Sequence, residues 1–429
     1  MPEAGSGFAF SAGSSAGYGT DIAPSHAMPP TQFGPARTLS DIFGDGVSFS
    51  ARPPFSGRYF MWPATATAVD ARTGNFLSIA GTTTTVCARS VAGARGLALL
   101  EAAGVPSTAP LVLFDAESSY REILAAATRL GSRIAVQYLH PPDELSPATC
   151  WSDPDLHSFL NNKGNLGLLV HAEHTPQRTV VPLDQLEDLE ALRPNRAQPL
   201  VLKGATDFDS GSGAAVVIAR SPGDIRRARR RFEGFDAVVV EEFLALERNL
   251  CLCYATDGRT VEYHGYSDQL TDDQGVYQGN VLTPVVPAPP EAIAAGHHIM
   301  NEAVRRGYRG FAGFDMAILA GGRVAVMDLN FRLCASTPAV LWYGAICERA
   351  GAGLHARYCI LRGRHPLGTL LPVALQAVAE GTFFPLSVFD PELSPEPDAA
   401  PVIRGLVLGD DREAVERNLA KLAEAGLVT

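Results

Sequence analysis

The chain has 429 residues, of which 46% are hydrophobic and 19% are charged, and its formal net charge at pH 7 is -11. This length favours two or three domains over one, and the acidic balance argues against a nucleic-acid partner, because surfaces that track phosphates need a basic stripe. No run approaches the roughly 18 apolar residues that a membrane helix needs, so we expect no membrane partner. The basic cluster at residues 226–231 lies in a helical pattern and is interpreted as a solvated helix face.

The start of the chain is rich in Gly, Ser, Ala and Pro and lacks a sustained period, so we predict an extended or disordered arm over residues 1–56. It carries no charged segment followed by an apolar core, which a secretory signal would need. The seven cysteines are scattered, odd in number and free of CxxC spacing, which favours buried thiols in a reducing compartment over disulfides or a zinc site. We therefore expect a cytoplasmic protein.

Strand and helix patterns alternate in the stretch that follows. We expect a helix, a strand, a second helix and a second strand at residues 92–103, 111–114, 118–130 and 133–138. Gly104, just after the first helix, is a common C-cap. This alternation is typical of an α/β domain with a parallel sheet, which we place at residues 57–154.

A lysine ends the buried strand pattern at residues 199–203, and a turn rich in Gly and Ser follows it. This turn contains Ser210, Gly211 and Ser212. Its backbone N–H groups can approach a phosphate, and Lys203 would supply a positive charge. A plain β-turn would show the same glycines, and no Gly-Lys-Ser/Thr follows, so the segment is not a Walker A loop.

The strand pattern at residues 235–240 leads into a glutamate-rich segment that contains Glu241, Glu242, Phe243, Leu244 and Glu247. An adenine needs an apolar slot with backbone donors and acceptors along one edge, and a carboxylate suits the ribose hydroxyls. Glutamates at a strand end are also often merely solvated. The next segment, residues 266–284, is polar and contains glycine, and we predict a loop there that lines or covers an acceptor site.

Two β-runs, residues 313–320 and 323–330, are separated by Gly321-Gly322, which signals a tight hairpin. A two-residue turn would place Asp315 directly opposite Asp328. One face of the hairpin would then be apolar and carry Phe314, Met316, Ile318, Ala325, Met327 and Leu329. The other face would carry Ala317, Leu319, Val324 and Val326, with Asp315, Asp328 and Asn330 at its open end.

The two facing carboxylates predict a metal site. Like charges placed opposite each other on strands are destabilising, so a protein that keeps them usually supplies a cation. Oxygen ligands suit Mg²⁺, with Mn²⁺ as a substitute, which makes Asp315, Asp328 and Asn330 candidate ligands. Arg332 can lie on the same side and bind a phosphoryl or carboxylate group through its planar fork of donors. The alternative is a hairpin end in solvent, where the two carboxylates point apart.

Residues 385–401 are rich in proline and are interpreted as a linker or loop. A strand pattern at residues 402–408 and a helical pattern at residues 411–425 follow it. We therefore predict that residues 385–429 form a linker and a small strand-helix element.

The order of these pieces over residues 155–359 resembles the ATP-grasp superfamily, and the string Asp328-Leu329-Asn330 with Arg332 is the most specific part of the resemblance. The resemblance implies an α/β (α+β) fold, with a Rossmann-like domain at residues 57–154 and an ATP-grasp domain at residues 155–384 whose two α+β subdomains clamp ATP. Phe331, where many members have Pro, and Asp328, where Glu is commoner, depart from the family pattern.

By the same resemblance, each group of candidate residues receives a role. Lys163 and Lys203 would hold the phosphates of ATP together with the turn that contains Ser210, Gly211 and Ser212. The segment Glu241, Glu242, Phe243 and Leu244, with Glu247, would hold adenine and ribose. Asp315, Asp328 and Asn330 would hold the magnesium ion.

The resemblance also implies a reaction, in which ATP phosphorylates a carboxylate and an amine then displaces phosphate to form an amide. Positioning and charge neutralisation carry such phosphoryl transfer, and Arg332 and Arg309 are the candidates for holding the acyl phosphate. Residues 59–63 and the stretch after them are similar to the preceding domain of ligases that build peptides or amides in specialised metabolism, such as antibiotic biosynthesis.

We therefore expect two small-molecule substrate groups, a carboxylate and an amine, that are carried by amino acids or peptides. The amide bond would form between two molecules or within one molecule as a lactam. The alternatives are a carboxylate–thiol ligase, a small-molecule kinase on the same fold, and a non-catalytic nucleotide-binding module. A monomer and a homodimer both fit the sequence.

Overall fold

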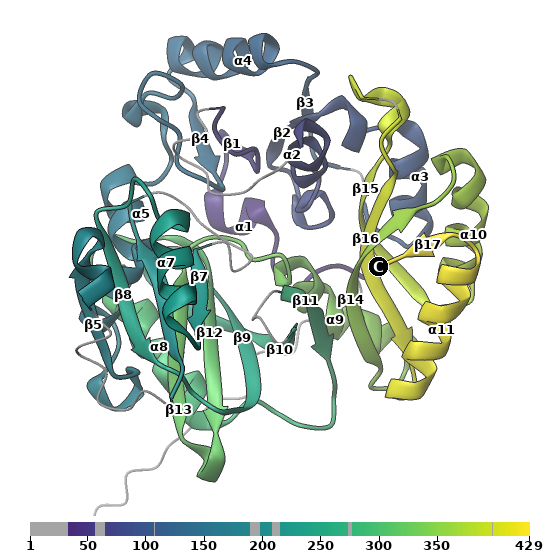
Figure 1. Ribbon diagram of the computed structural model, residues 1–429. Coiled ribbons are helices and arrows are strands. Elements are labelled where there is room, and N and C mark those ends of the chain that lie inside the picture. The colour runs from purple at the N-terminus through teal and green to yellow at the C-terminus, as the bar shows by residue number, and fades with distance from the viewer. Residues whose placement is uncertain are drawn as a thin grey trace, which may run out of the picture. The chain divides into compact units, whose positions relative to one another are not determined.

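The computed structural model describes residues 33–55, 65–106, 108–188, 198–207, 215–272, 277–396 and 398–429 (Figure 1). Three sheets organise these residues. Three predicted segments lie outside the described residues: most of the arm at residues 1–56, the segment at residues 59–63, and the turn with Ser210, Gly211 and Ser212. In the described segments, no helix is long and apolar enough to cross a bilayer.

The N-terminal sheet is parallel, as predicted, with the strand order β3-β2-β1-β4. Its strands are β1 (Val47–Ser50), β2 (Thr84–Ala88), β3 (Leu111–Phe114) and β4 (Arg133–Val136). The helices of this region are α1 (Leu39–Phe43), α2 (Ala66–Arg72), α3 (Ala94–Ala102) and α4 (Glu117–Leu130). The helices and strands that alternation predicted here are therefore present.

The predicted N-terminal arm is wrong at its C-terminal end. Strand β1 lies between β2 and β4, and its Phe49 is 2% exposed. The rings of Phe43 and Phe76 pack against Phe49, with centroids 5.7 Å and 5.8 Å away. This strand has the sequence Val-Ser-Phe-Ser, with only two apolar residues and with Gly46 just before it, whereas the equally short strand at residues 111–114 is entirely apolar, so the signal of β1 in the sequence is weaker.

The second sheet is small and antiparallel, in the order β5-β8-β6-β7. Its strands are β5 (Arg178–Pro182), β6 (Leu200–Ala205), β7 (Val216–Ala219) and β8 (Ala237–Glu242). Helix α7 (Pro222–Arg231) packs on one face through Ile225 and Ala228, and its arginines are exposed, which confirms the predicted solvated helix face. Since side chains alternate along a strand, Lys203 and Glu241 point to the other face.

The third sheet has nine strands, in the order β13-β12-β9-β10-β11-β14-β16-β15, with β17 beside β14. The strands on the side of the hairpin are β9 (Leu246–Thr256), β10 (Val261–Thr271), β11 (Tyr277–Leu282), β12 (Gly310–Leu319) and β13 (Val324–Asn330). The C-terminal strands are β14 (His355–Gly363), β15 (Phe383–Phe389), β16 (Val402–Gly409) and β17 (Leu427–Val428).

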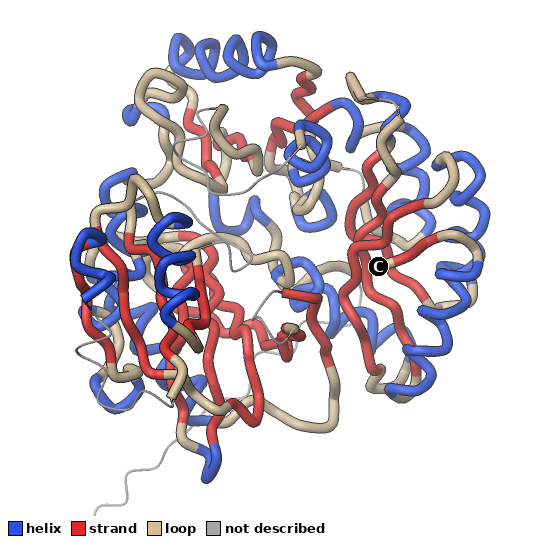
Figure 2. Tube along the Cα trace, in the orientation of Figure 1, coloured by secondary structure: helices blue, strands red, loops and turns tan. Residues whose placement is uncertain are grey.

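Helices cover this large sheet at both ends (Figures 1 and 2). Helix α8 (Pro290–Arg305) packs on β9 and β10, α9 (Thr337–Ala350) packs on β10, and α5 (Pro154–Asn161) contacts β13. At the other end, α3 packs on β15 and α10 (Leu367–Ala379), and α11 (Arg412–Glu424) packs on β16. Each end therefore buries its own apolar cluster.

The predicted linker at residues 385–401 is wrong in its first part. Residues 383–389 form β15, every residue of which is buried. Pro385 is tolerated because β15 is an edge strand of the sheet and its pairing with β16 shifts register between Pro385 and Ser387. The C-terminal strand and helix that the sequence predicted therefore extend the large sheet instead of standing apart from it.

The predicted loop at residues 266–284 is also wrong, because β10 and β11 occupy most of it. Gly279 supported the loop prediction, but its φ is +128° and a Cβ at this position would lie 2.7 Å from the carbonyl oxygen of Tyr358. The glycine permits the close approach of β14 to β11. Glycine here marks strand contact and not a turn.

Candidate functional site

The hairpin of β12 and β13 places Asp315 directly opposite Asp328, as predicted. The turn differs from the prediction, because it spans Ala320–Gly322 and Leu319 N donates to Arg323 O at 2.9 Å. The ladder therefore begins one residue out of the predicted register, with Ile318 opposite Val324. A β-bulge at Met327 adds one residue to β13 and restores the pairing of the two aspartates.

The bulge also changes which side chains face the core. Val324 and Val326 are fully buried in the large apolar cluster, whereas Ala325 and Met327 belong to a smaller cluster on the other face. The predicted faces of these four residues were therefore wrong. The predicted faces of β12 and of Leu329 are confirmed.

The two facing carboxylates have different surroundings. Lys163, which follows α5, places Nζ 2.6 Å and 2.5 Å from the two carboxylate oxygens of Asp328. Burial would raise the pKa of Asp328, but Lys163 and Lys203 outweigh burial and lower it. Asp315 accepts a hydrogen bond from the Gln269 amide, and burial and the nearby Asp328 charge raise its pKa. One carboxylate is thus held in its charged form and the other is held nearer to neutral.

The second lysine lies in a buried ionic network. Lys203 Nζ is 2.5 Å from Glu241 Oε2 and 2.6 Å from the carbonyl oxygen of Met327. Arg178 Nη1 is 3.3 Å from Glu241 Oε1, and Arg178 Nη2 donates to the carbonyl oxygen of Lys163. Sequence reasoning missed Arg178, because only the pairing of β5 with β8 brings it opposite Glu241.

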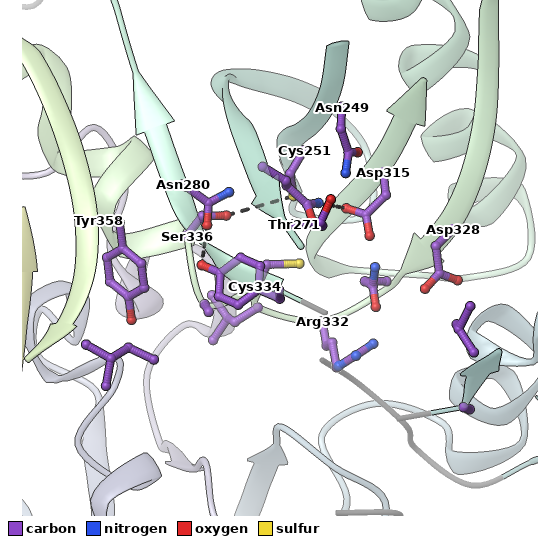
Figure 3. Close-up of a pocket in the computed structure, with 18 of the residues that line it drawn as sticks. Asn249, Cys251, Thr271, Asn280, Asp315, Asp328, Arg332, Cys334, Ser336 and Tyr358 are labelled. Atoms are coloured by element: carbon purple, nitrogen blue, oxygen red, sulfur yellow. Dashed lines mark hydrogen bonds between the residues drawn. The ribbon is translucent and has the colours of Figure 1, made fainter. Parts of the chain in front are cut away.

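A cavity of about 540 Å³ opens beside these groups. Figure 3 shows Asp315, Asp328 and Arg332 on one side of it and Asn280 and Tyr358 on the other. Lys163, Lys203, Glu241 and Asn330 also line it. This volume lies within the usual range of small-molecule sites. The structure therefore brings together both predicted lysines, all three predicted metal ligands and Arg332.

The glutamate-rich segment reaches the cavity in part. Glu242, Phe243 and Leu244 line it together with Val201 and Ile218. Glu242 Oε1 accepts a hydrogen bond from Gln177 N at 3.0 Å, and Phe243 is 40% exposed. Glu247 is exposed on β9 and is not among the described residues that line the cavity.

Asn249, two residues beyond Glu247, does line the cavity. Its Oδ1 is buried and has no hydrogen-bond partner in the described part of the chain. A buried acceptor without a partner is costly, which points to a ligand donor at this place. The sequence gives little sign of this role, because an asparagine in an apolar strand can equally be a structural polar residue of the core.

Arg309 was predicted as a catalytic candidate, but it is not among the described residues that line the main cavity. Its Nη2 donates to the carbonyl oxygen of Trp151 at 3.1 Å, and its guanidinium lies over the Trp151 ring at 4.3 Å from the centroid. It lines a smaller pocket of about 40 Å³ instead of the main cavity. Its charge already has a backbone acceptor and a ring face, so it holds local structure.

Several further cavity residues escaped the sequence prediction. They come from β10 and β11, from α2, and from the C-terminal strands: Gln269, Thr271, Tyr277, Asn280, Arg72, Tyr358, Arg362 and Arg404. The first four lie in the segment that was expected to line an acceptor site, although as strands. Tyr358, Arg362 and Arg404 are brought together by the pairing of β14 with β16, and Arg72 reaches the cavity from α2.

Comparison with known proteins agrees with this arrangement. Residues 176–330 match the family described as L-aspartate–L-methionine ligase, ATP grasp, and residues 38–158 match the L-aspartate–L-methionine ligase N-terminal domain. Among solved structures, N5-carboxyaminoimidazole ribonucleotide synthetase with ADP is similar, with a TM-score of 0.54, 14% identity and coverage of 80% of this chain and 96% of that one.

The Staphylococcus aureus N5-carboxyaminoimidazole synthetase with ADP has a TM-score of 0.52 and 14% identity, over 81% of this chain and 99% of that one. At this identity the likeness concerns the fold alone. The predicted ATP-grasp fold is confirmed.

Proposed function

This chain belongs to the ATP-grasp superfamily and is an ATP-dependent ligase that joins a carboxylate to an amine, and we propose that both of its substrates are L-amino acids. The two matching family models, both described by an aspartate–methionine ligase, cover the N-terminal sheet and the strands from β5 to β13, which carry Lys203, Glu241, Asp315 and Asp328. We therefore propose L-aspartate and L-methionine as the first pair to test.

We assign the nucleotide to the side of the cavity that the small sheet forms. Val201, Ile218, Phe243 and Leu244 offer an apolar slot for adenine. Lys163 and Lys203 would contact the phosphates, and Glu241 keeps Lys203 in place. For the ribose we replace the predicted Glu247 with Asn249, whose unpartnered Oδ1 can accept a hydrogen bond from a hydroxyl.

The residues at the hairpin fit a magnesium ion. The side chains of Asp315, Asp328 and Asn330 would each bind the ion through an oxygen atom, which is the ligand atom that Mg²⁺ prefers. Asp328 already holds a cationic group, since Lys163 Nζ lies 2.6 Å from its Oδ1. Magnesium bound by these three residues would supply positive charge against the phosphates. Manganese prefers the same ligands.

The chain's own cations account for the remaining charge. In the first step a carboxylate oxygen of the acid attacks the γ-phosphorus and ADP leaves; in the second, the amine attacks the acyl carbon and phosphate leaves. Arg332 lines the cavity two residues beyond Asn330, where its guanidinium can neutralise the acyl phosphate. Lys203 would neutralise the phosphates of departing ADP.

The test is product analysis with purified protein, ATP, magnesium, L-aspartate and L-methionine. We expect ADP, phosphate and a dipeptide in equal amounts, with the dipeptide identified by mass. Phosphate released without consumption of the amine, or an accumulating phosphorylated product, would instead support a kinase. Omission of each substrate in turn provides the controls, and a product one water lighter than a single substrate would reveal lactam closure.

A further inference from the structure

The half of the cavity away from the lysines has its own charged wall. Tyr358, Ile360 and Arg362 of β14 line it, and so does Arg404 of β16. Arg404 pairs across the ladder with Ile360, and Arg362 pairs with Val402 two residues along. Because β14 and β16 are antiparallel neighbours, these side chains share one face of the sheet. Arg72 of α2 lines the cavity as well.

Arg404 is a buried charge, with 8% exposure. Its Nη1 donates to the carbonyl oxygen of Ala71 at 3.1 Å. Burial, and then the charges of Arg72 and Arg362, lower its pKa, so both of these guanidinium groups lie close enough to repel that of Arg404. In the described segments, no carboxylate lies within ion-pair distance of Arg404 or Arg362.

Two other arginines of the chain have a carboxylate at ion-pair distance. The largely buried Arg178 lies 3.3 Å from Glu241, and Arg357, on the opposite face of β14, lies 3.0 Å from Glu416. A buried arginine without an anion is destabilising, since its desolvation is not compensated. The arrangement around Arg404 is therefore suited to an anion that comes from outside the chain.

The surroundings narrow the chemistry of this anion. Phe76, Phe389, Val402 and Ile360 form apolar wall beside the arginines. An apolar wall next to a guanidinium suits an organic carboxylate, whose carbon skeleton is buried while its oxygens accept a fork of N–H donors. The phosphates of ATP have the separate lysine side of the cavity.

We propose that Arg404, with Arg72 and Arg362, binds the carboxylate that is not activated in the ligase reaction. This inference rests on the proposed function, since it needs an amino-acid substrate. Two sources carry such a group: the side-chain carboxylate of the amino acid that is phosphorylated, and the α-carboxylate of the amino acid that supplies the amine. Arg404 thus selects the substrate, and the site of phosphoryl transfer lies elsewhere in the cavity.

The experiment combines enzyme variants with matched amides and measures binding by titration calorimetry in the presence of ADP and Mg²⁺. The probes are L-aspartate against L-asparagine, and L-methionine against L-methioninamide. We expect Arg404→Met to weaken binding of one acid by roughly 10- to 100-fold and to leave binding of its amide unchanged, because a charged hydrogen bond is lost only with the acid. The affected pair identifies the source of the carboxylate.

Further variants separate this role from a general loss of structure. Arg362→Met lies at an exposed position, so folding should survive, and we expect a smaller loss in the same direction. Arg404→Lys should recover part of the affinity, because it keeps the charge and loses the fork. Arg357→Met, on the same strand but the opposite face, is the matched control and should leave binding of all four probes unchanged.

Two outcomes overturn the inference. Either the wild type binds each acid no better than its amide, or Arg404→Met weakens acid and amide equally in both pairs. Failure of the proposed function has a different signature, namely selective, Arg404-dependent binding of an acid without formation of any dipeptide.

Discussion

The ammonium nitrogen of Lys203 lies 2.6 Å from the carbonyl oxygen of Met327, the residue that bulges from β13. This contact joins the small sheet to the hairpin, and it places the lysine beside the two facing aspartates. The bulge re-aims Met327 and Asp328 together toward the cavity, as bulges near functional sites often do. The predictions below test the groups that meet at this point.

Asp328→Asn keeps the shape of the side chain and removes its charge. We expect kcat/KM to fall by roughly 100-fold or more, because charge stabilisation of the phosphates is lost. The change also leaves Lys163 without its anion, so urea unfolding is measured beside the kinetics to separate lost stability from lost catalysis. ADP formation measured across a magnesium titration is the assay, and wild-type kinetics at low magnesium would contradict the assigned role.

Asn249→Ala should raise the KM for ATP by about 5- to 10-fold with little change in kcat, since one neutral hydrogen bond to the ribose is removed. Glu247→Gln is the comparison, because this exposed side chain does not line the cavity. We expect the KM for ATP of that variant to equal that of the wild type. The opposite ranking of the two variants would restore the original assignment of Glu247.

Substitution of the two arginines predicted from the sequence, Arg332 and Arg309, should have different effects: the first on kcat and the second on stability. Arg332→Met should lower kcat by roughly 100-fold, because a cation beside the acyl phosphate is lost. Arg309→Met should keep kcat and lower the free energy of unfolding by about 0.5–1 kcal/mol, the usual contribution of a cation–π contact. Steady-state kinetics and urea unfolding of both variants measure the two effects. Equal losses of kcat would return Arg309 to the active site.

Glu241→Gln should destabilise the chain strongly, because Lys203 and Arg178 would remain buried without their anion. We expect a loss of about 3 kcal/mol or more in the free energy of unfolding. Glu413→Gln is the control, since its ion pair with Arg417 is solvent-exposed and should contribute less than about 1 kcal/mol. Denaturant unfolding of both variants gives the comparison, and a neutral Glu241→Gln would contradict the buried network.

Asp70 in α2 offers a pH-dependent test of stability. Burial raises its pKa from 3.8 to about 6, against the smaller opposing effect of Arg52. A folded-state pKa above the unfolded value gives stability below pH 3.8 that is lost as the pH rises to about 6. Asp70→Asn removes this loss, so its advantage in melting temperature over the wild type should grow between these two pH values and stay constant above. Equal differences at pH 4.5 and 7.5 would contradict the shift.

The hairpin illustrates what the sequence could predict and why. Counting from a two-residue turn placed Asp315 opposite Asp328 correctly, although the turn is one residue longer and Met327 bulges. The two errors cancel at the aspartates and not at Val324 to Met327. Bulges depend on contacts between elements, here Lys203 with the Met327 carbonyl, which local patterns do not contain.

Other errors share the same cause. Pro385 and Gly279 are signals for loops, and the structure uses them at an edge strand and at a close strand contact. Arg178 and Arg404 become functional candidates only when strand order brings them to the cavity. Motifs that lie within a single hairpin or strand end, such as Lys203 and Asp328, could be found from the sequence because their geometry is local.

The hairpin and the two arginines Arg362 and Arg404 belong to one hydrogen-bonded sheet, whereas Lys203 belongs to another. Movement of the small sheet would change the distance from this lysine to ATP, while the spacing between β12 and β16 would stay fixed. The arginines that we propose for the second carboxylate therefore lie on a different sheet from the lysine that we propose for the phosphates of ATP. Substitutions that loosen the clamp should slow turnover without admitting longer acids.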